Sequence, residues 1–168
     1  MDPIKQFELE RADAIEAMGK DQELRKKSLD WMLHADKYKY TYNYSWMGRP
    51  IIKYPNDISI LQEMIWKLKP DYIVETGIAH GGSIIFSASM LELLGHGEVI
   101  AVDIDIRQHN REEIEKHPMN KRITMIEGSS IDPEIVNSIK EKVKGKKVLV
   151  CLDSNHTHDH VLEELRMY

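Results

Sequence analysis

The sequence predicts an α/β fold in which a doubly wound parallel sheet carries helices on both faces. Three observations support this: four short apolar segments rich in β-branched residues, helical segments between them, and an acidic residue at the end of each apolar segment. Strands that are apolar on both faces are typical of parallel sheets buried between helix layers. Alternating strands and helices favour right-handed crossovers within one sheet. The expected strands cover residues 72–74, 99–102, 123–126 and 147–152.

Helix boundaries are marked by local signals. The helix before the first strand should end ahead of Pro70, because proline cannot continue the hydrogen-bond ladder. Gly95 closes the next helix, and Asp132 followed by Pro133 is a typical helix start. We expect helices at about residues 56–68, 83–94, 111–116, 132–144 and from 157 onward.

The N-terminal third of the chain differs in texture. Residues 1–54 are predicted to form a helical and aromatic extension packed on the core, and residues 55–168 the α/β domain. Apolar residues could line one side of each of two N-terminal helices. The segment 38–46 is rich in aromatic residues and has too many large side chains to stay in water.

Composition narrows the class of protein. The 168 residues carry a net charge of −5, which argues against a nucleic-acid partner. Cys151 is the single cysteine, so an internal disulfide is excluded. No stretch approaches the roughly 18 apolar residues that span a bilayer, and the charged N-terminus lacks the apolar core of a signal peptide. A cytoplasmic location is the default expectation.

An acid stands at the end of each expected strand. These residues are Glu75, Asp103, Glu127 and Asp153. Polar residues commonly end strands, which explains one or two of the four easily and all four less well. Because ligands of open α/β sheets bind at the carboxyl ends of the strands, we expect a ligand site there.

The first strand end carries a glycine loop of the pattern E-x-G-x-x-x-G-G. A dinucleotide fold would have G-x-G-x-x-G, with its glycines positioned for a pyrophosphate. An acid at the first position repels a diphosphate and suits a ligand with a positive amino group. S-adenosylmethionine (SAM) has an amino-acid tail and a sulfonium, and no phosphate. The cofactor-binding candidates in this loop are Glu75, Gly77, Ala79, Gly81, Gly82 and Ser83.

The second and third strand ends extend this site. Asp103 stands where an acid accepts hydrogen bonds from ribose hydroxyls, and Asp105 is a weaker candidate for that task. Ser129 and Ser130 could border an adenine ring, or belong to a plain turn. Together with the glycine loop, these residues favour a nucleoside with an amino-acid tail over a dinucleotide.

The fourth strand end is rich in histidine and aspartate. Asp153 could bind a divalent metal through oxygen, and His156 could act as a general base or orient one. If His156 and His160 both lie on the final helix, their spacing puts them on one face. A solvent-exposed turn and helix cap is the alternative interpretation, and the spacing matches no standard zinc motif.

These residues resemble the cephalosporin hydroxylase family, which includes rhamnosyl O-methyltransferases. The resemblance extends over roughly residues 44–168. It rests on the stretches 46–52, 54–57, 74–83, 152–156 and 160–162, above all on E-T-G-I-A-H-G-G-S combined with D-S-x-H-x-x-x-H.

The resemblance implies a Rossmann-like class I SAM-dependent methyltransferase fold that binds SAM and Mg²⁺. It implies methyl transfer rather than oxygen insertion. By similarity, the glycine loop and Asp103 would hold SAM, and Asp153 would be one metal ligand. Family members complete the metal site with an acidic pair after a further strand. Since the sequence stops at Tyr168, we expect the last strands, part of the acceptor pocket and two metal ligands to be missing.

The resemblance predicts a Mg²⁺-assisted O-methyltransferase acting on a hydroxyl of a sugar or natural product, a small-molecule or glycan acceptor, with His156 as the candidate base. The aromatic segment 38–46 could form a wall of the acceptor site, or pack the N-terminal helices onto the sheet. A non-catalytic SAM-binding or oligomer-forming module is the second hypothesis, and a homo-oligomer fits either. An NAD-dependent oxidoreductase is less consistent with Glu75.

Overall fold

The structure, a computed structural model, describes residues 2–168. The chain forms two compact units, one extending to Tyr40 and one covering Thr41–Tyr168. The first unit consists of α1 (Pro3–Lys20) and α2 (Gln22–Asp36). Asp2 and Asp21 cap these helices by accepting backbone N–H bonds. Within the described chain, no helix combines the length and apolar character needed to cross a membrane.

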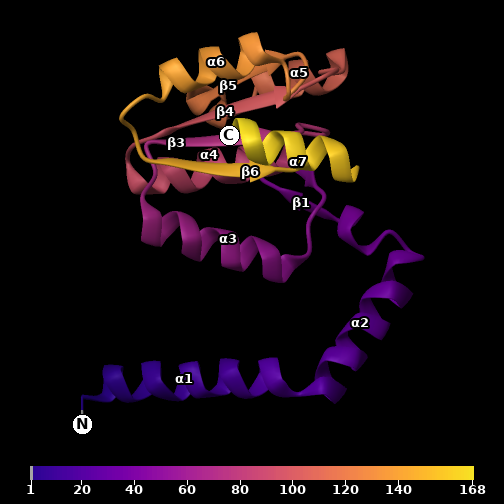
Figure 1. Cartoon of the computed structure of the whole chain (residues 1–168), viewed down its shortest axis with the longest axis vertical. Helices are drawn as coiled ribbons and strands as arrows, with labels where there is room; N and C mark the ends of the chain where they lie inside the picture. Colours follow the sequence, from indigo (N-terminus) through magenta and orange to yellow (C-terminus); the bar gives the residue numbers. More distant parts are fainter. Residues whose placement is uncertain (1) are drawn as a thin grey trace. The chain divides into compact units, whose positions relative to one another are not determined.

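The second unit is built on a four-stranded parallel sheet in the order β5-β4-β3-β6. The strands are β3 (Tyr72–Thr76), β4 (Glu98–Asp103), β5 (Ile123–Glu127) and β6 (Val148–Leu152). The chain places β4 and β5 on one side of β3 and then crosses over to add β6 on the other side (Figure 1). The strand order therefore reverses between β3 and β6, where open α/β sheets bind ligands.

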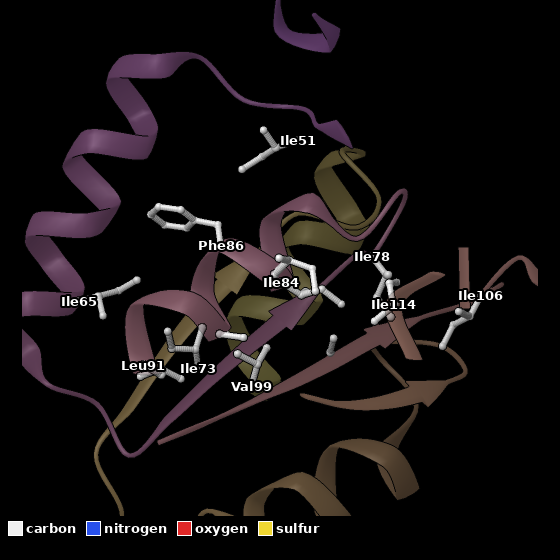
Figure 2. Close-up of a cluster of buried hydrophobic side chains, with 13 residues drawn as sticks. Ile51, Ile65, Ile73, Ile78, Ile84, Phe86, Leu91, Val99, Ile106 and Ile114 are labelled. Atoms are coloured by element: carbon white, nitrogen blue, oxygen red, sulfur yellow. The ribbon is translucent and has the colours of Figure 1, made fainter. Parts of the chain in front are cut away.

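Helices cover both faces of this sheet (Figure 1), which confirms the predicted α/β fold. They are α3 (Pro55–Leu68), α4 (Gly82–Leu94), α5 (Gln108–Glu115), η2 (Pro118–Arg122), α6 (Pro133–Lys142) and α7 (His158–Met167). Ile73 of β3 belongs to the larger core with Ile65 of α3 and Phe86 of α4 (Figure 2). Val74, the next residue, faces the smaller core with Ile139 of α6. Side-chain alternation along the strand thus supplies both cores.

The helix signals in the sequence act as predicted. Helix α3 ends two residues before Pro70, and Lys69 takes up a left-handed conformation with φ 48°. Gly95 closes α4 with φ 80°. The side chain of Asp132 accepts the backbone N–H of Glu134 at 2.8 Å and begins α6. These are local contacts, so local sequence is sufficient to encode them.

A hairpin that the sequence analysis did not predict precedes α3. After the short turn η1 (Tyr40–Tyr42), β1 (Tyr44–Trp46) pairs antiparallel with β2 (Arg49–Ile51). Both turn residues, Met47 and Gly48, have positive φ, as two-residue hairpins favour. The Trp46 ring packs edge-on against Phe86 at 4.9 Å, and its Nε1 donates to Ser89 Oγ at 2.9 Å. These contacts fix the hairpin on α4.

Candidate functional site

Two cavities lie at the carboxyl ends of the strands. The Glu75 cavity, about 320 Å³, lies where β3 and β6 end; the predicted residues that line it are Glu75, Gly77, Ala79, Gly82, Ser83, Asp153 and His156. The Asp103 cavity, about 300 Å³, lies where β4, β5 and β6 end; the predicted residues that line it are Asp103, Ser129, Ser130 and His160. Ser154 lines both cavities. The parallel topology therefore gathers Glu75, Asp103 and Asp153 around these cavities. Glu127, the fourth predicted strand-end acid, lines neither cavity and accepts from Arg111 Nη2 at 2.6 Å.

Glu75 is a buried carboxylate that faces the first cavity. The residue is only 1% exposed, and neither of its carboxylate oxygens has a hydrogen-bond partner among residues 2–168. Burial raises the pKa of Glu75 to about 7, while nearby Ser83 and the positive charge of Lys53 oppose the rise. A buried carboxylate without a partner costs free energy, and such groups are concentrated at functional sites. The carboxylate suits a ligand that brings an ammonium group.

Lys53 is a site residue that sequence reasoning missed. Its Nζ lies 2.9 Å from Asp153 Oδ2. Burial alone would lower the pKa of Lys53, but the negative charges of Glu75 and Asp153 raise it above its ordinary value. One ammonium thus faces two carboxylates, so the Glu75 cavity keeps an excess of negative charge whenever both are ionised. The only hint of Lys53 in the sequence is its position directly after the apolar residues 51–52.

The Asp153 carboxylate also holds His156. Nε2 of His156 lies 3.2 Å from Asp153 Oδ1, a hydrogen bond when that nitrogen carries its proton. The His156 side chain is 78% exposed at the cavity rim. His156 precedes α7, which begins at His158, so it does not share a helix face with His160. The two histidines instead line different cavities.

The described residues do not form a metal site by themselves. In residues 2–168, no group of three or more histidine, cysteine, aspartate or glutamate side chains could hold a metal ion. Asp153 offers a single carboxylate, and its two oxygens already face Lys53 and His156. A metal at this position would compete with the Lys53 ammonium for Asp153.

The loop glycines are required by the packing of the chain on itself. Gly77 has φ 91°, and a Cβ there would lie 2.1 Å from the carbonyl oxygen of Asp153. A Cβ on Gly82 would lie 2.1 Å from the carbonyl oxygen of Pro50, and one on Gly81 would lie 2.6 Å from the Ile114 side chain. These contacts are a reason for glycine that is independent of any ligand. The predicted role of the glycines in ligand approach stays a prediction.

Asp103 joins the glycine loop to the second cavity. Its Oδ2 accepts the backbone N–H groups of Ile78 at 2.7 Å and Ala79 at 3.3 Å, and Oδ1 accepts that of Asp105 at 3.2 Å. The carboxylate therefore shapes the loop and lines the Asp103 cavity together with the exposed Ile104. Binding of a ribose by Asp103 remains a prediction.

The polar groups of the Asp103 cavity bind one another. His160 Nε2 lies 3.0 Å from Ser130 Oγ and 3.2 Å from Ser154 Oγ. Ser154 donates to Oε1 of Glu164 at 2.6 Å. Burial works to raise the pKa of Glu164, but hydrogen bonds from Ser130 and Ser154 and the nearby His160 hold it below its ordinary value. Glu164 was missed because a glutamate on a helix normally indicates a solvated face.

Solved structures define the class of fold. A CmcI structure with S-adenosylhomocysteine (SAH) superposes with a TM-score of 0.51 and 22% identity, over 74% of this chain and 58% of that chain. The O-methyltransferase from Bacillus cereus in complex with SAH gives a TM-score of 0.51 at 16% identity, over 84% of this chain and 61% of that chain. The α/β unit therefore has the class I SAM-dependent methyltransferase fold.

The chain belongs to the rhamnosyl O-methyltransferase/CmcI family, whose profile matches residues 38–168. It is 29% identical over 127 residues to the rhamnosyl O-methyltransferase of Mycobacterium leprae (strain TN), covering 73% of this chain and 53% of that protein. It is 28% identical over 132 residues to that of Mycobacterium tuberculosis (strain H37Rv), covering 73% and 50%. The chain spans about half the length of these curated relatives. The family resemblance inferred from the sequence is confirmed.

Proposed function

We propose that this chain supplies the SAM-binding part of an O-methyltransferase that acts on a hydroxyl of a sugar or natural product. The observation that carries the proposal is Glu75, a buried carboxylate that lacks a hydrogen-bond partner within residues 2–168 and faces a cavity at the strand-order reversal. Family membership supports the reaction type, and the names of the curated relatives support a rhamnosyl acceptor.

The two cavities suit the two ends of SAM. Glu75 would accept hydrogen bonds from the ammonium of the amino-acid tail, and the negative charge of the Glu75 cavity favours the sulfonium. Asp103 would accept from the ribose hydroxyls, while Ser129, Ser130 and the apolar Ile104 would border the adenine. SAM, when bound, supplies the methyl group.

His156 is our candidate for the group that takes the proton from the acceptor hydroxyl. Asp153 orients the imidazole, and both residues line the Glu75 cavity. Tyr42 lines the same cavity and provides an aromatic surface for a sugar ring. The rest of the contribution to catalysis is alignment of the two reactants, which can lower a barrier by about 7–11 kcal/mol.

A role for Mg²⁺ is supported by fewer residues than the binding of SAM. Asp153 is one candidate ligand, and Lys53 is bound to it.

Titration calorimetry with SAM, SAH and NAD tests the cofactor. We expect SAM and SAH to bind and NAD not to bind; binding of NAD alone would refute the proposal. Methyl transfer from SAM to a panel of rhamnosides and other glycosides, with and without magnesium, tests the reaction. Binding of SAH without turnover on any acceptor would favour the non-catalytic SAM-binding module.

A further inference from the structure

Ala79, in the middle of the glycine loop, has an unfavourable backbone conformation. Its φ is 47°, in the left-handed region that residues other than glycine, asparagine and aspartate seldom occupy. Such strain persists only where surrounding contacts hold it, and it is concentrated at ligand-binding loops. The contacts that hold Ala79 therefore fix the conformation in which the loop would meet its ligand.

Side chains from distant elements anchor both peptide groups that flank Ala79 and the next peptide group along the chain. Asn110 of α5 donates through Nδ2 to the carbonyl oxygen of Ala79 at 2.8 Å. Arg49 of β2 donates through Nε and Nη2 to the carbonyl oxygen of His80 at 2.9 and 2.7 Å. On the other side, Asp103 accepts the N–H of Ala79.

The two anchoring side chains also hold each other. Nη2 of Arg49 donates to Oδ1 of Asn110 at 2.9 Å, so one planar guanidinium binds the loop and the amide that binds the loop. Asn110 is 3% exposed, and hydrogen bonds at such a buried position are costly to lose. The fork of arginine donors suits this arrangement, whereas the single ammonium of a lysine cannot reproduce it.

We propose that Arg49 and Asn110 are positioning residues that hold Ala79 in its left-handed conformation and so preorganise the loop for SAM. The proposal rests on the function proposed above. A loop that is competent for only part of the time binds its ligand more weakly in proportion to that fraction. Carbonyl groups held by Arg49 and Asn110 are also kept from turning toward the Glu75 cavity, where they would oppose the carboxylate of an amino-acid tail.

The test combines loss of the anchor with relief of the strain. Asn110→Ala should weaken SAH binding by about tenfold, because Ala79 can then leave the left-handed region. Ala79→Gly alone gives the reference affinity for a loop in which positive φ carries no strain. In the Asn110→Ala background, Ala79→Gly should recover at least about threefold, because glycine populates positive φ readily. Calorimetry with SAH measures all four affinities.

Lys69 provides the matched control. It is also left-handed, with φ 48°, but it caps α3. Lys69→Gly should leave SAH affinity within about twofold in both backgrounds, since the relief of strain there is remote from the loop. Recovery by Lys69→Gly as large as that by Ala79→Gly would overturn the proposal, because the effect would then be one of general stability.

Arg49→Lys gives an independent variant if Asn110→Ala fails to fold. It keeps the charge and loses the fork, and we expect SAH binding several-fold weaker and again recovered by Ala79→Gly. Unchanged SAH affinity in Asn110→Ala or in Arg49→Lys would refute the anchoring role. So would failure of Ala79→Gly to recover affinity in those backgrounds.

Hydrogen exchange of residues 77–83 without ligand separates this proposal from the cofactor assignment. Loss of either anchor should speed exchange in this segment, and Ala79→Gly should restore part of the protection. If the unaltered chain binds no SAH but the exchange pattern is as expected, the cofactor assignment fails and the anchor stands. If SAH binds and exchange is unaltered in the variants, the anchor fails and the cofactor assignment stands.

Discussion

Two buried glutamates near the strand ends differ in their hydrogen bonds: Glu75 lines the first cavity, and Glu164 contacts Ser154, which lines both cavities. Glu75 and Glu164 are both 1% exposed. In the described chain, neither oxygen of Glu75 has a hydrogen-bond partner. Among the same residues, Glu164 lacks a partner at Oε2 alone, because its Oε1 accepts from Ser154 at 2.6 Å. Their pKa values move accordingly, to about 7 for Glu75 because burial dominates, and below the ordinary value for Glu164 because hydrogen bonds outweigh burial.

On this difference rests our proposal that Glu75 binds the ligand and that Glu164 is structural. Burial is common to both residues, so burial does not identify the site. The distinguishing feature is hydrogen-bonding capacity that the chain leaves unused, since native proteins satisfy nearly all buried polar groups. Substitutions and changes of pH test the comparison, beginning with the largest expected effect.

Gly77→Ala should disrupt both cavities at once. The new Cβ would lie 2.1 Å from the Asp153 carbonyl oxygen at a residue with φ 91°, and the adjoining Ser154 lines both cavities. We expect the free energy of unfolding to fall by about 3–5 kcal/mol and SAH binding to be lost. Denaturant unfolding and calorimetry measure the two effects. Gly145→Ala, at φ 72° with open space around it, should cost only about 1 kcal/mol; equal costs would contradict the role of the close approach.

Substitution by glutamine should have opposite effects on stability at the two buried glutamates. At pH 8, Glu75→Gln should raise the free energy of unfolding by roughly 3 kcal/mol, because it removes a buried charge whose pKa is strongly raised. SAH binding should weaken by about a hundredfold through loss of a charged hydrogen bond.

Glu164→Gln is the matched control for this substitution. It should lower the free energy of unfolding by about 1 kcal/mol, because its hydrogen-bonded carboxylate is stabilising. SAH affinity should stay within about threefold. Thermal unfolding and calorimetry measure stability and SAH affinity of both variants. Stability changes of the same sign at the two positions would show that the two glutamates do not differ as described.

The stability of the chain should depend on pH with opposite signs through the two glutamates. The raised pKa of Glu75 gives stability that is present below pH 4.5 and lost as the pH rises through about 7. The lowered pKa of Glu164 gives stability that is present above pH 4.5 and lost as the pH falls below it. Unfolding curves of the unaltered chain and both glutamine variants from pH 4 to 8 separate the contributions.

Ligand binding should follow the ionisation of Glu75. SAH affinity should rise about tenfold from pH 6 to pH 8, because the ammonium requires the ionised carboxylate. The Glu75→Gln variant should show no such rise. A rise of the same size in that variant would assign the pH dependence to another group.

The smallest effect is expected from Ser154→Ala. Loss of the donor to Glu164 should lower the free energy of unfolding by about 1–2 kcal/mol. SAH affinity should change by less than about threefold, since Ser154 acts on the internal network. A large loss of binding with unchanged stability would place Ser154 among the ligand contacts instead.

The β3–α7 part of the fold was predictable because its signals are local. Pro70, Gly95 and Asp132 mark helix ends through contacts with their immediate neighbours. The hairpin was not predictable in this way. Its strands have three residues each, and its position depends on Trp46 packing against Phe86, far along the chain.

The sequence by itself determined which residues meet at the strand ends. Parallel pairing brings the carboxyl ends of all four strands to one edge, so the four acids had to lie along that edge once the strands were identified. That Glu127 lines neither cavity was not predictable, because its partner Arg111 comes from another element. The distribution of the other three acids over two cavities and the exposure of His156 could not be inferred, since both depend on where α7 begins.

Only the tertiary structure decided which acids are already satisfied. Lys53 reaches Asp153 across 100 residues of sequence, and Arg49 reaches Asn110 across 61. No local pattern encodes these pairs, because each requires the hairpin to be placed against the sheet by packing. Whether a strand-end carboxylate is free to receive a ligand depends on such long-range partners, and in this chain it is Glu75 that they leave without a hydrogen bond among residues 2–168.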